Sequence, residues 1–289
     1  MTIGTSAYWR AAHGRGISLD GKGRLMAIVN VTPDSFSDGG RHFSVDKAVE
    51  HALGCLADGA DILDIGGEST RPGAAPVSPA EEQDRVLPVI ERLACETEAL
   101  ISIDTYRAAT ARLAVTAGAH IINDVYGLQK EPEIAAIAAA TGAGLCVMHT
   151  GRGRERLADV VADQFDYLER SLTIAAEAKV AREAIVLDPG FGFAKETVEE
   201  NMALMARCDE LLALGYPLLV GTSRKRFLGT LTGRDAGERD AATAATTALL
   251  RLKGASVFRV HNVAINRDAL AVADAMIAAQ RESGKGQAR

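Results

Sequence analysis

The chain has 289 residues, of which 47% are hydrophobic and 24% are charged, and its formal net charge at pH 7 is −6. This composition supplies enough apolar material for a large core and excludes an intrinsically disordered chain. The acidic balance argues against a general nucleic-acid-binding surface.

The four cysteines are scattered along the chain, without a Cys-x-x-Cys spacing. A structural zinc site and a disulfide framework are therefore disfavoured, as in proteins of the reducing cytosol. Residues 1–24 lack the apolar core of a signal peptide, and no apolar run approaches the roughly 20 residues of a membrane span. We therefore expect a soluble, cytoplasmic protein with neither membrane nor nucleic-acid partners.

Residues 1–24 are weakly patterned, which predicts a partly flexible extension where Ile17 and Leu19 form a short capping strand. Beyond them, apolar stretches typical of buried parallel strands alternate with amphipathic segments typical of helices. The predicted strands are residues 25–29, 62–65, 100–103, 120–122, 144–148, 185–187, 218–220 and 257–260. Helices are predicted near residues 45–58, from 79, at 106–116, near 134–138, at 154–180, up to 214, at 239–253 and at 265–279.

Strands that alternate with helices pair in parallel through right-handed crossovers. Eight such units predict a closed (β/α)8 TIM barrel, formed as a single domain by residues 25–280, with a tail at 281–289. A doubly wound open sheet is the alternative fold. The first strand is not followed by a Gly-x-Gly-x-x-Gly motif, which disfavours the dinucleotide-binding form of that sheet.

Polar clusters follow the predicted strands at the ends that a barrel gathers on one rim, where active sites lie. They are Asn30, residues 66–71, Asp104, Asn123 with Asp124, His149, Asp188, residues 223–225, and Arg259 with His261. A plainer interpretation is that loops are polar anyway and that some members cap helices. That interpretation suits Asp124 and Thr105, and Asp64 could be structural, but the set as a whole indicates a binding site.

One part of this rim carries acceptor side chains. Asp104, Asn123 and Asp188 are short carboxylate and amide residues, and buried aspartates need a hydrogen-bonding partner. They could hold a flat heterocycle that is rich in N–H donors. Lys225, from the loop after the seventh predicted strand, would supply a balancing donor.

Another part of the rim is suited to an anion. Arg259 and His261 alternate to the same face of the last strand, and the second loop offers Thr70 and Arg71. These groups suit a phosphate or diphosphate, because a guanidinium matches phosphate oxygens. A diphosphate usually brings Mg²⁺, to which Asn30 could contribute one oxygen. Motifs for a protein nucleophile are lacking, so the groups indicate a transferase that positions two substrates.

Seven ordered segments resemble the dihydropteroate synthase family and cover nearly all of residues 25–279. They are NVTPDSFSDGG (30–40), GADILDIGGESTRPGA (59–74), ISIDTYR (101–107), GAHIINDV (118–125), LDPGFGFAK (187–195), LLVGTSRKRFLG (218–229) and FRVHNV (258–263). The resemblance implies a (β/α)8 barrel enzyme of folate biosynthesis. It would join 6-hydroxymethyl-7,8-dihydropterin diphosphate to 4-aminobenzoate, forming 7,8-dihydropteroate and releasing diphosphate.

The resemblance also implies roles for individual residues. The pterin-binding residues would be Asp104, Asn123, Asp188, Lys225 and Met148. The diphosphate-binding residues would be Asn30, Thr70, Arg259 and His261, with Asn30 also touching Mg²⁺. The residues around 4-aminobenzoate would be Phe36, Arg71, Pro72, Phe193 and Ser223, of which Ser223 would meet the carboxylate. The catalytic residues would be Lys225, Arg259, His261 and Asp104.

The chain departs from the family pattern in three places. Thr150 and a basic loop, residues 152–156, follow the fifth-strand Met-His where a second Met is frequent. We interpret the arginines of this loop as a solvated helix entrance. Asn262 stands where Asp is common, and Ala194 stands where Gly is frequent.

Two other functions stay open. A methyltetrahydrofolate:corrinoid methyltransferase would share the Asp/Asn/Asp pterin pocket, but it has neither a diphosphate nor an arylamine to hold. A non-catalytic barrel would bind a folate precursor without turning it over. The Ala-rich stretch at 269–279 suits close packing either at a dimer interface or on the barrel. We expect a homodimer, and the resemblance implies a sulfonamide target.

Overall fold

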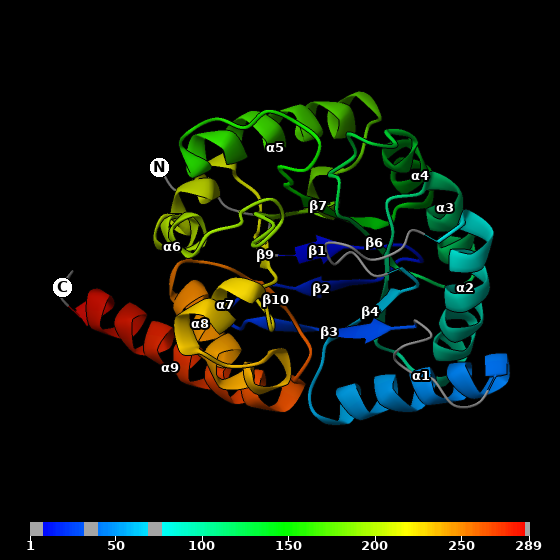
Figure 1. Cartoon of the computed structure of the whole chain (residues 1–289), viewed down its shortest axis with the longest axis horizontal. Helices are drawn as coiled ribbons and strands as arrows, with labels where there is room; N and C mark the ends of the chain where they lie inside the picture. The colour runs from blue at the N-terminus through cyan, green and yellow to red at the C-terminus, as the bar shows by residue number, and fades with distance from the viewer. Residues whose placement is uncertain (1–7, 32–39, 69–76, 287–289) are drawn as a thin grey trace.

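Eight parallel strands occupy the centre of the molecule, and helices surround them as a ring (Figure 1). The computed structural model describes residues 8–31, 40–68 and 77–286. The strands are hydrogen-bonded in the order β8-β7-β6-β5-β4-β3-β10-β9. They are β3 (Arg24–Asn30), β4 (Ile62–Gly66), β5 (Leu100–Asp104), β6 (Ile121–Asp124), β7 (Gly144–Met148), β8 (Ile185–Asp188), β9 (Leu219–Val220) and β10 (Val257–Val260).

The two outer strands of this order, β8 and β9, also meet. A parallel bridge joins Leu187 to Leu218, and the Leu187 amide donates to the Pro217 carbonyl oxygen at 3.0 Å. An open sheet would keep its two edge strands apart, whereas here the sheet returns onto itself. The predicted (β/α)8 TIM barrel is therefore confirmed, and the doubly wound alternative is wrong.

The helices follow the strands in chain order. They are α1 (Gly40–Ala57), α2 (Pro79–Glu96), α3 (Ala108–Thr116), α4 (Glu133–Thr141), α5 (Val160–Glu177), α6 (Val198–Ala206), α7 (Arg226–Thr232), α8 (Asp240–Leu252) and α9 (Val263–Gly286). The last of these extends beyond the ring (Figure 1). α5 begins later than the predicted residue 154, because Asp159 caps it by accepting from the Val161 and Ala162 amides. The basic stretch before α5 is thus a loop.

Side chains point alternately to the two faces of each strand, which divides the buried core into two clusters. The outward-facing residues pack with the helices in the larger cluster. The smaller cluster takes one inward-facing residue from each strand: Met26, Ile62, Leu100, Ile121, Cys146, Val186, Leu219 and Val257. These residues form an apolar layer near the N-terminal ends of the strands.

A hairpin before the barrel covers that apolar layer. β1 (Tyr8–Arg10) pairs antiparallel with β2 (Gly16–Ser18), which contains Ile17. Trp9 is only 1% exposed and joins the inner cluster, and its indole Nε1 donates to the Ala184 carbonyl oxygen at 2.9 Å. The hairpin therefore closes the N-terminal end of the barrel, while the domain limits at residues 24 and 280 stay predictions.

Candidate active site

Five of the eight inward positions become polar or charged two residues further along the strands. Counting two residues on from each member of the apolar layer gives Ile28, Asp64, Ser102, Asn123, Met148, Asp188, Gly221 and Arg259. Because side chains alternate along a strand, these residues face the same interior, one layer closer to the C-terminal rim. Two residues further again, β3 and β5 end in Asn30 and Asp104. The barrel thus brings the predicted residues of six strands together.

Arg259 joins two carboxylates inside the barrel. Its Nε donates to Asp64 Oδ2 at 2.6 Å, and its Nη2 donates to Asp104 Oδ2 at 2.6 Å. Asn123 Nδ2 donates to the same Asp64 oxygen at 3.1 Å. Burial opposes the charged guanidinium, but the attraction of Asp64 and Asp104 raises the pKa of Arg259 above its usual range. Arg259 therefore stays a cation between two acids.

Burial shapes the proton affinity of Asp104. It raises the pKa of Asp104 to about 7, while the nearby Arg259 guanidinium opposes the shift.

The second oxygen of Asp64, Oδ1, is buried and has no hydrogen-bond partner among the described residues. Unsatisfied buried acceptors are costly, so this layer has unused capacity to accept hydrogen bonds.

Asp188 and Lys225 carry opposite charges that attract each other across the site, with Asp188 buried and Lys225 partly exposed. The Gly190 amide donates to Asp188 Oδ1 at 2.7 Å, and Lys225 Nζ donates to the Phe191 carbonyl oxygen. Burial raises the pKa of Asp188, against the attraction of Lys225. Burial also lowers the pKa of Lys225 to about 7, against the attraction of Asp188. A ligand donor near Asp188 would therefore replace hydrogen bonds that burial removed.

Ser223 and His261 are bonded to each other at the rim. Ser223 Oγ and His261 Nδ1 are 2.9 Å apart, and the His261 amide donates to the same hydroxyl at 3.1 Å. The two residues follow β9 and β10, which are neighbouring strands. The structure thus places Ser223 beside a predicted diphosphate ligand, and its predicted contact with the aminobenzoate carboxylate stays a prediction.

Of the remaining predicted residues, some lie near the site and four fall outside the described part of the chain. Met148 is buried, and the Phe193 ring lies 4.4 Å from Lys225 Nζ and 4.5 Å from the Arg152 guanidinium carbon. A Cβ at Gly66 would lie 3.5 Å from Asn30 Oδ1 and 3.7 Å from Asp104 Oδ2, so Gly66 leaves open the space between them. Four predicted residues lie outside the described ones: Phe36, Thr70, Arg71 and Pro72.

A model of the family described as pterin binding enzymes matches residues 26–261. The Bacillus subtilis dihydropteroate synthase is 48% identical over 247 residues, which are 86% of this chain and 86% of that protein. A Streptococcus pyogenes dihydropteroate synthase is 46% identical over 256 residues, with coverage of 88% and 96%. The chain belongs to the dihydropteroate synthase family.

Solved dihydropteroate synthases share the fold over almost their whole length. The Xanthomonas albilineans enzyme with 4-aminobenzoic acid is 44% identical, with a TM-score of 0.88, and is matched over 94% of this chain and 99% of its own. The same enzyme in complex with 7,8-dihydropteroate gives a TM-score of 0.85 at 42% identity, with coverage of 93% and 99%. A Yersinia pestis enzyme in a sulfonamide drug complex gives 0.85 at 40% identity, with coverage of 92% and 98%.

This dihydropteroate synthase family member departs from the family pattern at three places. The structure shows the contacts or the backbone conformation of the residues there. Arg154 is not solvated as predicted: its guanidinium donates to both Asp163 oxygens, at 2.9 and 2.6 Å, and its side chain is 18% exposed. Asn262 Nδ2 donates to Asp240 Oδ2 at 3.0 Å. Ala194 adopts a φ of 56°, a conformation that glycine adopts more easily.

Sequence reasoning missed three polar residues that belong to the site or its support. The place of Asp64 within a strand allows a structural role, but its inward position two residues after Ile62 matches that of the other site residues. The sequence marks His149 only as a strand end and Lys195 only as part of a motif. Both are buried and 3.0 Å apart, between Lys195 Nζ and His149 Nδ1. Lysines are seldom fully buried, so the residue type alone gives no reason to expect Lys195 in the interior.

Proposed function

We propose that the chain joins 6-hydroxymethyl-7,8-dihydropterin diphosphate to 4-aminobenzoate, forming 7,8-dihydropteroate and releasing diphosphate in folate biosynthesis. The relatives are dihydropteroate synthases, and solved members hold 4-aminobenzoic acid or 7,8-dihydropteroate. The observation that carries the proposal is the contact of Arg259 with Asp64 and Asp104 inside the barrel. It offers acceptors to an N–H-rich ring and a cation to a diphosphate in one place.

The pterin end of the proposed site is formed by Asp104, Asn123, Asp188 and Met148. All four side chains are buried, and the carboxylates lack the water that would otherwise solvate them. The N–H groups of a pterin would supply donors to these acceptors, and Met148 would pack against the flat ring. Lys225, whose Nζ donates to a backbone carbonyl, would add a donor for a ring acceptor.

The diphosphate end would be formed by Arg259 and His261, with Asn30 and Thr70. Nε and Nη2 of Arg259 donate to carboxylates, and no hydrogen bond from Nη1 is found within the described chain. A guanidinium carries five N–H donors, so several stay available to phosphate oxygens. Ser223 would orient His261 through its contact with Nδ1.

Mg²⁺ would be the ion that accompanies the diphosphate. Among the described residues no group of three His, Cys, Asp or Glu side chains could hold a metal. Asn30 offers one neutral oxygen near Asp104, which suits an ion that keeps several waters and binds mainly through substrate phosphates. When bound, Mg²⁺ would supply positive charge to the leaving group.

The reaction would be a substitution at the methylene carbon of the pterin. The C–O bond to diphosphate breaks, Arg259 and His261 stabilise the departing anion, and the positive charge left on the carbon spreads into the pterin. Asp104 and Asp188 favour that cation electrostatically. The neutral amine of 4-aminobenzoate then forms the C–N bond and loses a proton. Catalysis thus comes from positioning and charge.

The test is an assay with both substrates. The purified chain should release one diphosphate for each 7,8-dihydropteroate formed, and Arg259→Ala should lower turnover. Unchanged turnover in Arg259→Ala would contradict the leaving-group role. Pterin binding without diphosphate release would identify the non-catalytic alternative, and methyl transfer from methyltetrahydrofolate to a corrinoid would identify the methyltransferase.

A homodimer, a cytoplasmic location and sulfonamide inhibition complete the proposal. The packed helices α8 and α9 expose large apolar side chains: Leu249, Leu252, Val272 and Met276. Exposed apolar side chains of this size favour a partner surface. Light scattering should therefore give twice the 30.4 kDa chain mass.

The cytoplasmic location is supported by the cysteines. All four are free thiols, as expected in a reducing compartment, and the described helices include none that could cross a membrane.

A further inference from the structure

Lys195 is a buried amine behind the proposed pterin site. It is 3% exposed, and its Nζ donates to the Gly190 carbonyl oxygen at 2.9 Å and to the Phe193 carbonyl oxygen at 3.5 Å. The same nitrogen lies 3.0 Å from His149 Nδ1. Within the described part of the chain, no hydrogen bond or ion pair joins it to a carboxylate. Its contacts are therefore with one turn of backbone and one histidine.

That turn, residues 188–195, carries the predicted pterin and aminobenzoate contacts. Gly190 has a φ of 62°, and a Cβ there would collide with the His149 carbonyl oxygen, so the turn lies directly on the β7 end. Its amide donates to Asp188 Oδ1 at 2.7 Å. One residue on, the Phe191 carbonyl oxygen accepts from Lys225 Nζ. Any shift of the turn would move both charged groups of the pterin end.

His149 is itself held by a charged cluster. Its Nε2 lies 2.9 Å from Asp163 Oδ2, and Arg154 Nη2 donates to the same oxygen at 2.6 Å. Asp163 Oδ1 also accepts from the Leu157 amide at 2.8 Å. Asp163 belongs to the first turn of α5, so the cluster ties the histidine to a helix. Lys195 thus connects the turn 188–195 to a fixed support.

We propose that Lys195 is a positioning residue of the pterin site, which holds the turn 188–195 against His149 and thereby sets the places of Asp188 and Lys225. This inference rests on the proposed function, in which Asp188 and Lys225 bind the pterin. Lys195 does not touch the substrates in this role. It acts through the carbonyl oxygens of Gly190 and Phe193.

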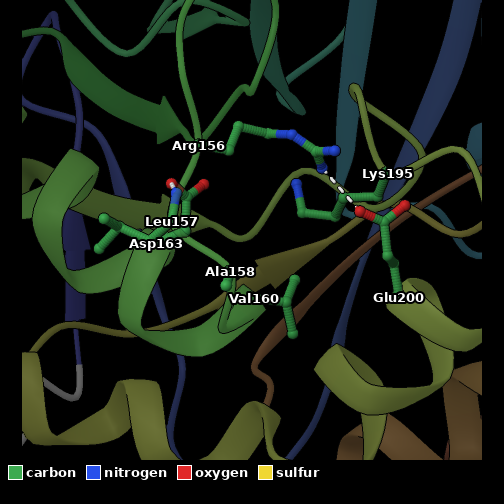
Figure 2. Close-up of a pocket in the computed structure, with 7 residues that line it drawn as sticks. All are labelled: Arg156, Leu157, Ala158, Val160, Asp163, Lys195 and Glu200. Atoms are coloured by element: carbon green, nitrogen blue, oxygen red, sulfur yellow. Dashed lines mark hydrogen bonds and ion pairs between the residues drawn. The ribbon is translucent and has the colours of Figure 1, made fainter.

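A cavity beside Lys195 leaves space for a longer side chain, so the residue can be substituted without crowding the turn. The cavity has a volume of about 340 Å³, and Lys195 and Asp163 line it together with Arg156 and Glu200, which pair at 2.8 Å (Figure 2). It gives a longer side chain room beside the turn. Lys195→Arg should therefore keep the N–H donors without displacing the backbone, whereas Lys195→Met keeps the length and loses the donors.

Full-length variants test the proposal by kinetics. In Lys195→Met the KM for the pterin diphosphate should rise about tenfold while kcat changes less than about threefold, because binding geometry is lost before chemistry. Lys195→Arg should return the KM to within about threefold of the wild-type value. The control Arg156→Gln, which lines the same cavity but pairs with Glu200, should keep the wild-type KM.

Hydrogen exchange of the substrate-free protein tests the same idea without relying on activity. In Lys195→Met the amides of residues 188–195 and of the loop after His149 should exchange faster, and the rest of the barrel should not. A wild-type KM with wild-type exchange would overturn the proposal. An even rise through the whole barrel would also overturn it, since Lys195 would then stabilise the fold in general.

The failure of the proposed function can be told apart from the failure of this inference. If Asp188→Asn binds the pterin diphosphate as tightly as the wild-type protein, the assignment of the pterin site is wrong. The exchange measurement still decides the role of Lys195 in that case, because it needs no substrate.

Discussion

Arg259 and Asp64 meet inside the barrel although their strands are not neighbours, since β3 lies between β10 and β4. The guanidinium Nε and the carboxylate Oδ2 are 2.6 Å apart, and the Asp64 side chain is fully buried. The same carboxylate oxygen accepts from Asn123 on β6. Asp64 therefore fixes a proposed diphosphate ligand relative to a proposed pterin ligand.

Asp64→Ala should lower kcat/KM about 100-fold, because Arg259 would lose one of its two carboxylates and a shift of about 1 Å at such a group costs roughly that much. The free energy of unfolding should fall by about 3 kcal/mol, since a buried cation keeps a single partner. Steady-state kinetics and urea denaturation measure the two effects.

Asp61 is the matched control, because it pairs with Arg24 at 3.0 Å just before the same strand, with side chains about a quarter exposed. Asp61→Ala should leave kcat/KM within about threefold, since this pair lies at the N-terminal end of the strand, away from the site. Wild-type kcat/KM in Asp64→Ala would show that Arg259 does not depend on this contact.

Most of the barrel was predictable from the sequence because its strands are buried on both faces. Such strands appear as uninterrupted apolar runs, as in 25–29 and 185–187, and these runs coincide with β3 and β8. The hairpin of β1 and β2 was not predictable in the same way. Its strands have three residues each, and Trp9 is held by Ala184, far away in sequence.

The residues that form the site could be predicted from the sequence, but the contacts between them could not. Strand-end position identified Asp104 and Arg259, because the ends of parallel strands meet on one rim. Which acid meets which base depends on the stagger of strands around the barrel, and this stagger is not written in any local pattern. Asp64 was therefore overlooked, and Ser223 was assigned without His261, its bonded neighbour.

Ser223→Ala distinguishes two roles for this serine. If Ser223 acts through His261, the KM for the pterin diphosphate should rise about fivefold, the cost of roughly one hydrogen bond, while the KM for 4-aminobenzoate stays within about twofold. Ser223→Thr keeps the hydroxyl and should resemble the wild-type enzyme. A selective rise in the KM for 4-aminobenzoate would instead support the predicted carboxylate contact.

Trp9→Ala should destabilise the barrel without impairing its site. Trp9 is 1% exposed and packs in the apolar layer, so its loss should lower the free energy of unfolding by about 3 to 5 kcal/mol. Tyr8, its neighbour, is 46% exposed, and Tyr8→Ala should cost about 1 kcal/mol or less. Equal losses in the two variants, measured by urea denaturation, would show that the hairpin does not seal the barrel.

The stability of the protein should rise from pH 7 to pH 9 relative to Lys195→Met. Burial lowers the pKa of Lys195 from its ordinary 10.5 to about 7, and the facing charges of Lys225 and Arg156 add to this while Asp188 and Asp163 oppose it. Between these values the folded state binds fewer protons than the unfolded state. The free energy of unfolding therefore increases with pH, by about 2 kcal/mol over this range.

Urea denaturation at several pH values measures this difference. Lys195→Arg provides the control, because a guanidinium stays charged throughout the range and should gain no such stability. His149 Nδ1 lies 3.0 Å from Lys195 Nζ, and Arg154 Nη2 lies 2.9 Å from the other ring nitrogen of His149; both residues are present in all three proteins. If the wild-type protein and Lys195→Met show parallel pH profiles, the Lys195 amine keeps its ordinary proton affinity and burial does not neutralise it.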